Sequence, residues 1–115
     1  MANTFKQISK AGVTSSDVIY TVAGSTTTVV LGLIIGNTQS SDITVTLTID
    51  TDTANRSGAN NEVNQPIELL TSVTIPANSS LELLAGNKIV LEATDVINFT
   101  ASAAADISIS VMEIT

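Results

Sequence analysis

The clearest pattern in the chain is a strict alternation of apolar and polar residues over residues 42–51. Successive side chains of a β-strand point to opposite faces, so this segment is predicted to bury one face and expose the other. The side chains expected in the core are Ile43, Val45, Leu47 and Ile49, and those expected to meet water are Thr44, Thr46, Thr48 and Asp50.

The same period of two recurs in residues 18–22, 67–75, 81–84, 89–91, 97–101 and 107–111. Residues 27–35 add one more segment, which gives about eight predicted strands. Short connectors rich in Gly, Asn, Ser and Pro join them. A shift of 53 positions aligns residues 21–27 with residues 74–80, and two such corners fit two sheets packed face to face. The sequence therefore predicts an all-β fold, a single antiparallel β-sandwich that is jelly-roll-like, as one domain over residues 1–115.

Residues 27–35 depart from simple alternation because both faces carry apolar side chains. Two explanations are open. A loop or the N-terminal segment covers this strand within one subunit, or a second subunit covers it. One predicted face holds Val29, Leu31, Leu33 and Ile35, and the other holds Val30, Gly32 and Ile34.

Other apolar residues also stand on faces expected to be wet, in a chain with few charged residues. Closed symmetric oligomers commonly cover such surface, so we expect a homo-oligomer, with a trimer as the expected size. The candidate interface residues are Val30, Ile34, Leu70, Leu84, Val90, Met112 and Ile114.

Two segments lie outside the strand pattern. Residues 52–65 are rich in Asn, Asp, Ser and Gly and are expected to form a long surface loop. Residues 1–10 are expected to form an assembly arm that reaches outward, with the alternative that Phe5 and Ile8 belong to a first strand. The candidate contacts with a partner protein are Phe5, Lys6, Ile8, Lys10 and Arg56.

Charge narrows the range of partners. Eleven acidic and four basic residues give a net charge of −7, so the chain cannot neutralise a run of phosphates as nucleic-acid binding requires. The same argument excludes anionic membranes. The N-terminal residues lack the apolar core of a signal peptide, and the longest apolar run, residues 29–35, is far shorter than the roughly 20 residues of a membrane span. Synthesis in the cytoplasm is expected.

Residue types also narrow the chemistry. The chain has no Cys and no His, which removes disulfides, thiolate nucleophiles, the usual zinc sites and the commonest proton carrier near neutral pH. The carboxylates of Glu68, Glu82 and Glu92 occupy outward strand positions, where solubility is their expected role. Three aromatic residues are too few to wall a sugar-binding cleft. We therefore expect no enzymatic activity and no cofactor.

An oxygen-rich segment runs from Asp50 through Asp52 and Asn55 to Glu62. A helix-loop-helix calcium site needs Gly at its sixth position and Glu at its twelfth, whereas counting from Asp50 places Asn55 and Asn61 there. No metal site is expected, and an irregular calcium site in the loop is the alternative.

Three segments carry a resemblance. Residues 74–81 read Thr-Ile-Pro-Ala-Asn-Ser-Ser-Leu, residues 84–91 read Leu-Ala-Gly-Asn-Lys-Ile-Val-Leu, and residues 106–114 read Asp-Ile-Ser-Ile-Ser-Val-Met-Glu-Ile. They resemble the small virion structural proteins of tailed bacteriophages, especially phages of marine and cyanobacterial hosts. Residues 1–28 are similar too, so the resemblance spans nearly the whole chain, although Ala23 stands where that family usually has Pro. The shared features are strand and turn patterns rather than chemistry.

The resemblance implies a β-sandwich that assembles on the virion after synthesis in the host cytoplasm. Its implied partners are copies of itself and the major capsid protein, or proteins of the neck or tail. A capsid decoration protein is the favoured position because a lone domain without a helical shaft suits a capsid lattice. A neck, tail or short-fibre component is the alternative, and so is a module that binds carbohydrate or a host surface, although the chain has no Trp.

Overall fold

The computed structural model describes residues 2–51, 66–84 and 87–115. In these residues the chain forms β-strands and no helix, and hence no helix that is long and apolar enough to cross a membrane. In chain order the strands are β1 (Asn3–Val13), β2 (Asp17–Thr21), β3 (Thr27–Asn37), β4 (Ile43–Asp50), β5 (Pro66–Ile75), β6 (Ser80–Glu82), β7 (Ile89–Leu91), β8 (Val96–Ala101) and β9 (Ala105–Ile114).

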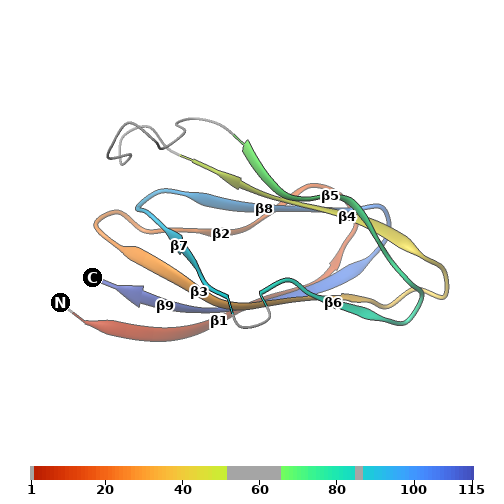
Figure 1. Ribbon diagram of the computed structural model, residues 1–115, viewed down its shortest axis with the longest axis horizontal. Helices are drawn as coiled ribbons and strands as arrows, with labels where there is room; N and C mark the ends of the chain where they lie inside the picture. Colours follow the sequence, from red (N-terminus) through yellow and green to blue (C-terminus); the bar gives the residue numbers. More distant parts are fainter. Residues whose placement is uncertain (1, 52–65, 85–86) are drawn as a thin grey trace.

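The strands form two layers (Figure 1). Sheet A has the order β1-β9-β3-β6, with β7 also paired to β3, and sheet B has the order β2-β8-β4-β5. All pairings are antiparallel. The chain crosses between layers at most connections, and the two similar corners predicted from the sequence both lead from sheet B to sheet A, as β2 to β3 and β5 to β6. The predicted antiparallel, jelly-roll-like β-sandwich is confirmed.

The core lies between the two sheets and is built from alternate side chains of each strand. Phe99 of β8 and Leu47 of β4 are paired in register and fully buried. Each fully buried side chain of this size stabilises the fold by about 1.5–3 kcal/mol. The four side chains of β4 that were expected in the core are all buried there: Ile43, Val45, Leu47 and Ile49.

The N-terminal segment is not a free arm. Residues 3–13 form β1, which pairs with β9 in unbroken register from Asn3 to Lys10 and occupies one edge of sheet A. Phe5 and Ile8 therefore belong to a first strand, the alternative left open by the sequence. The register shifts after Lys10, where Gly12 adopts a φ of 68° and its N–H donates to the Asp106 carboxylate at 2.9 Å. Only a residue without a Cβ adopts that conformation freely.

The irregularity of β3 has a structural cause, a β-bulge. Its pairing with β9 shifts register between Val30 and Gly32, so one extra residue is inserted and the faces exchange. Before the bulge Val30 faces the core at 1% exposure, and after it Leu33 and Ile35 do so. The expected outward position of Val30 is therefore wrong, while that of Ile34, 46% exposed, is right.

Two further outward assignments are corrected by the structure. Leu84 follows β6 and is 8% exposed in the core. Leu70 is half-buried against the core, because it pairs with the buried Leu47 where β5 shifts register twice against β4. Neither side chain lies free on the surface of the subunit.

Candidate functional site

The outward face of sheet A is the candidate functional site, and we call it the assembly face. It contains a row of apolar side chains that crosses four strands at one level. Phe5 of β1 is paired with Met112 of β9, Met112 with Val29 of β3, and Val29 with Val90 of β7. Residues paired directly across neighbouring strands share a face and touch, so these four side chains form one continuous apolar row.

The apolar row contains the two most exposed large hydrophobic side chains of the described residues. Phe5 is 71% exposed and Val90 is 61% exposed. Met112 and Val29 lie between them and are half-buried. Single exposed aliphatic side chains are normal on a protein surface, but a continuous row with aromatic and aliphatic ends indicates a contact surface.

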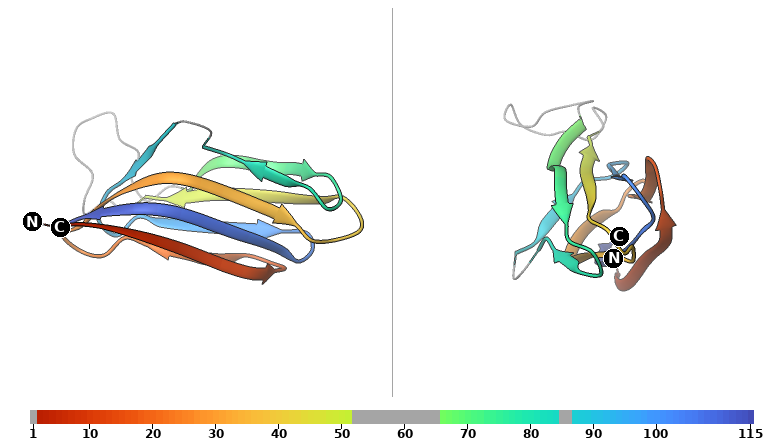
Figure 2. Two further views of the ribbon diagram at one scale, coloured as in Figure 1. Left: turned by 90° about the horizontal axis from the view of Figure 1, so that it is seen from below. Right: turned by 90° about the vertical axis from the view of Figure 1, so that its right-hand side faces the viewer.

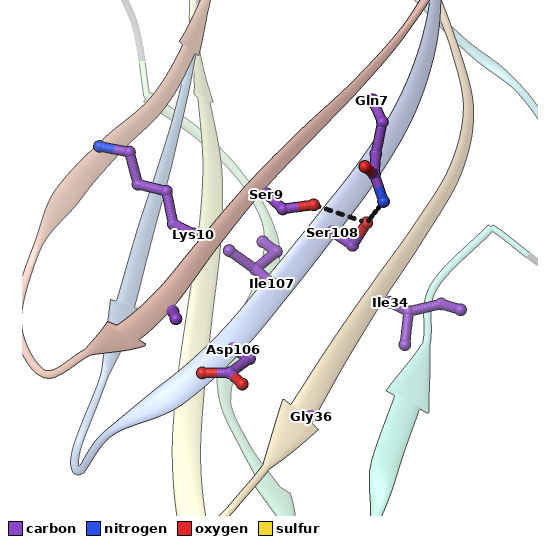
Figure 3. Close-up of a pocket in the computed structure, with 9 residues that line it drawn as sticks. Gln7, Ser9, Lys10, Ile34, Gly36, Asp106, Ile107 and Ser108 are labelled. Atoms are coloured by element: carbon purple, nitrogen blue, oxygen red, sulfur yellow. Dashed lines mark hydrogen bonds between the residues drawn. The ribbon is translucent and has the colours of Figure 1, made fainter.

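A shallow hollow of about 470 Å³ lies beside the apolar row on the same face. Its lining includes the small residues Ser9, Ala11, Gly36 and Ser108, and Figure 3 shows Ser9 and Gln7 converging on Ser108. The Ser108 hydroxyl is 3.1 Å from the Ser9 hydroxyl and accepts a hydrogen bond from the Gln7 amide at 3.3 Å. Ile34 forms an apolar margin of the hollow.

The basic residues of β1 face away from the assembly face. Lys6 is paired with the buried Val111, and Lys10 with the buried Ile107, so both lie on the inner side of the edge strand. Lys6 forms an ion pair with Glu113 at 2.9 Å, and Lys10 forms one with Asp17 at 3.2 Å. Both lysines thus hold the edge of sheet A to groups within the subunit, and the partner contact expected of them from the sequence stays a prediction.

A hydrogen-bond network links the two sheets near this edge. The Tyr20 hydroxyl of β2 donates to Glu113 of β9 at 2.5 Å and lies 2.7 Å from the Thr28 hydroxyl of β3. Burial raises the pKa of Tyr20 to about 12, and the hydrogen bond to Glu113 adds to that shift. The hydrogen bond from Tyr20, followed by that from Lys6, lowers the pKa of Glu113. The network fixes β1, and with it Phe5, against β9.

The structure thus brings only part of the predicted contact set together. Ile34, Val90, Met112 and Ile114 occur on the assembly face with Phe5, which was expected to act in the arm. Val29, Ser9 and Ser108 were missed, because the bulge in β3 hides the true face of Val29 and small polar residues give no sequence signal. Arg56 and the loop of residues 52–65, including most of the oxygen-rich segment, lie outside the described residues.

The outward face of sheet B differs in composition, and we call it the threonine face. Thr44 is paired with Thr74, Thr46 with Thr100, and Thr48 with Asn98. Across residues 2–51, 66–84 and 87–115, no group of three or more Asp, Glu, His or Cys side chains is placed to hold a metal ion. Binding through the assembly face is the activity that this geometry supports.

Comparisons with known proteins give a likeness in fold. No protein-family model and no curated protein sequence matches the chain. Among solved structures, a subunit of the disulfide-linked pili formed by Bacillus endospore appendages matches with a TM-score of 0.52 and 13% identity, over 99% of this chain and 87% of that chain. The infectious bursal disease virus VP2 subviral particle matches with a TM-score of 0.26 and 12% identity, over 99% of this chain and 41% of that chain. The first likeness supports the sandwich fold, and the second is too low to carry an argument.

Proposed function

We propose that the protein is a non-enzymatic structural protein of a tailed-phage virion, of the capsid decoration type, which assembles with copies of itself on the particle. The observation that carries this proposal is the apolar row of the assembly face, Phe5, Met112, Val29 and Val90. An exposed row of this kind costs solubility in an isolated subunit and stabilises an assembly in which it is buried. The resemblance of the chain to small virion proteins of tailed phages supports the identity of that assembly.

The decoration position is favoured over a carbohydrate-binding role by the placement of the aromatic side chains. Sugar-binding modules stack sugar rings on exposed Trp or Tyr. This chain has no Trp, its single Tyr20 is 9% exposed, and Phe99 is fully buried. Phe5 is the remaining aromatic residue, and it lies in the apolar row, paired with Met112. Neck, tail and short-fibre positions remain as alternatives within the particle.

A second candidate is a subunit of a surface fibre. It is favoured by the likeness in fold to the Bacillus pilus subunit, whose pili are described as disulfide-linked. This chain has no Cys, so a fibre built from it would rest on non-covalent contacts. Electron microscopy of the purified protein separates the two, since a fibre subunit forms filaments and a decoration protein forms closed oligomers.

The direct test is the copy number of the protein in particles of the phage that encodes it. We expect the chain to co-purify with intact virions through a density gradient, in a number that matches the capsid lattice. A number matching a six-fold or twelve-fold ring would move the protein to the neck or tail. Absence from washed particles, with the chain recovered free in the lysate, would contradict the proposal. A Phe5→Ser variant should attach less, whereas a Val18→Ser variant, which changes an exposed side chain of sheet B, should attach normally.

A further inference from the structure

The apolar row and the hollow lie symmetrically about a central line on the assembly face. That line consists of Gln7 of β1, Ser110 of β9 and Gly32 of β3, which are joined through register pairs. On each of these three strands, the residue of the apolar row lies two positions along the strand from the central line, and the residue of the hollow lies two positions from it in the opposite direction. In β3 the extra residue of the bulge is left out of this count. The matching pairs are Phe5 and Ser9, Met112 and Ser108, and Val29 and Ile34.

The central line is open and uncharged. Ser110 is exposed, and a Cβ built on Gly32 meets no other atom within 4 Å. The subunit itself therefore does not require a small residue at Gly32. Gln7, Ser110 and Gly32 of the central line carry no charge, whereas Lys10 and Asp106 line the hollow and Glu82 is paired with Ile34 beside it. A flat, uncharged strip with small residues along its middle allows a second surface to approach closely.

We propose that two copies of the chain pack assembly face to assembly face about a two-fold axis that runs along the central line. This rotation places Phe5, Met112 and Val29 of each copy over the hollow of the other copy, and Val90 over Glu82. Phe5 then lies over Ser9 of the second copy, Met112 over Ser108, and Val29 over Ile34. The proposal rests on the self-association in the proposed function and specifies the surface and the symmetry through which it occurs.

The size of the face fits a stable pair. A face of four strands about 4.8 Å apart and about 11 residues long at about 3.4 Å per residue covers roughly 700 Å². Specific interfaces bury about 800 Å² per partner. Sheets also pack face to face within the subunit itself, so the pair repeats an arrangement that this sequence already stabilises.

The symmetry of the surface favours a pair over the trimer expected from the sequence. A three-fold ring joins two different patches of each subunit, whereas a two-fold contact joins one self-complementary patch to itself. The assembly face carries the protruding row and the receiving hollow together. A single second copy is therefore enough to cover a surface of that kind.

The test places a large charged side chain on the axis. Ser110→Arg projects into solvent in a single subunit but meets its own copy at the centre of the proposed pair. Thr100→Arg is the matched control, since Thr100 is an exposed outward residue of β8, an internal strand of sheet B as β9 is of sheet A. Multi-angle light scattering at micromolar concentration should give twice the chain mass for the wild type and for Thr100→Arg, and the chain mass for Ser110→Arg. Circular dichroism checks that both variants fold.

A crosslinking experiment keeps the proposal falsifiable if Ser110→Arg does not fold. Gln7→Cys introduces a thiol into a chain without Cys, and a residue on the axis faces its own copy. A short bismaleimide should link Gln7→Cys into a covalent dimer and leave Thr100→Cys monomeric. A wild-type monomer, a trimer, an unchanged dimer for Ser110→Arg, or equal crosslinking of both thiols would each overturn the pair. A monomer in solution that is still present in many copies on washed virions would overturn the pair and leave the proposed function intact.

Discussion

The two outward faces of the sandwich differ although both sheets bury similar side chains inside. On sheet B the outward positions of β4 are Thr44, Thr46, Thr48 and Asp50, and Thr74 and Thr100 are paired with two of them. On sheet A the corresponding outward positions form the apolar row and the hollow. Inward positions are constrained by the shared core, so the outward positions are where the two sheets are free to differ.

The composition of the threonine face suits a β-sheet surface in contact with water. Threonine is β-branched and suits a pleated strand, and its hydroxyl stays hydrated. Paired threonines also stabilise neighbouring strands through their side chains. Val90, Val29 and Phe5 are good strand residues as well, but they have no group that water can bind. The assembly face therefore gains nothing as a solvent surface, which agrees with the proposed burial of this face against a second copy.

The prediction with the largest expected effect tests which residues next to the β-bulge of β3 face the core and which face outward. Val30→Thr buries a hydroxyl in the core and should lower the free energy of unfolding by about 1–3 kcal/mol. Val29→Thr changes the neighbouring residue on the assembly face and should alter it by less than about 0.5 kcal/mol. Urea denaturation of both variants, made in the Ser110→Arg background to remove self-association, measures the difference. Equal losses would show that the face assignment around the bulge is wrong.

The next effect compares an exposed apolar side chain on each sheet. Phe5→Ser should weaken self-association at least tenfold, which corresponds to about 1.4 kcal/mol, because aromatic side chains at an interface contribute strongly. Val18→Ser changes an outward residue of sheet B that is 48% exposed and should leave self-association unchanged. Sedimentation velocity over a dilution series provides both dissociation constants. A similar weakening in both variants would remove the distinction between the faces.

A smaller effect concerns the network that holds Phe5 in the apolar row. Glu113→Gln removes the ion pair with Lys6 and weakens the hydrogen bond from Tyr20, and should cost about 1 kcal/mol of unfolding free energy at pH 7. Because the pKa of Glu113 is lowered on folding, its charge stabilises the fold above the unfolded pKa of about 4.3, and this contribution is lost as pH falls through the folded pKa.

Thermal denaturation between pH 7 and pH 3 tests the Glu113 prediction. The melting temperatures of wild type and Glu113→Gln should converge as the pH falls below the unfolded pKa. A constant difference across this range would mean that the carboxylate charge of Glu113 has no part in the stability of the edge.

The smallest effect concerns Lys10, which forms the second ion pair of β1. Lys10 also donates to the Val18 carbonyl at 3.0 Å, and its side chain and that of Asp17 are 40% and 44% exposed. Exposed ion pairs contribute little, so Lys10→Gln should lower the free energy of unfolding by about 0.2–1 kcal/mol. Urea denaturation at low and high salt measures it, and the wild-type advantage should shrink at high salt. A loss of unfolding free energy larger than that of Glu113→Gln would mean that the Lys10–Asp17 ion pair stabilises β1 more than the contacts of Glu113 do.

Regular segments of the fold could be predicted from the sequence. Ile43, Val45, Leu47 and Ile49 alternate with threonines along β4, and all four are buried as expected. The sequence left strand β1 open as an alternative to a free arm, because its inward positions include Lys6 and Lys10 while Phe5 faces out. An edge strand permits this, since a lysine stem can lie along the core margin and its ammonium group can reach a carboxylate.

The candidate site was predicted only in part, for a related reason. Ile34, Val90, Met112 and Phe5 could be recognised as apolar residues at positions expected to be exposed. Their arrangement in one face depends on register between strands far apart in the sequence, which the pattern of a single strand does not contain. The bulge at Leu31 also exchanges Val29 and Val30 between the faces. Val29 and Val30 are the same β-branched residue type, so their strand propensity does not indicate which of them faces the core.

The short strands β6 and β7 give sheet A two unlike edges, and this has a consequence for aggregation. One edge is the continuous β1, and the other is divided into two strands of three residues each, which lie end to end along β3 (Figure 2). A growing cross-β stack needs a free edge at both ends of each added unit, so that every copy templates the next. Here an accidental pairing through β1 presents only the interrupted edge to a further molecule. Accidental polymerisation through the edges of sheet A should therefore stop after a single addition.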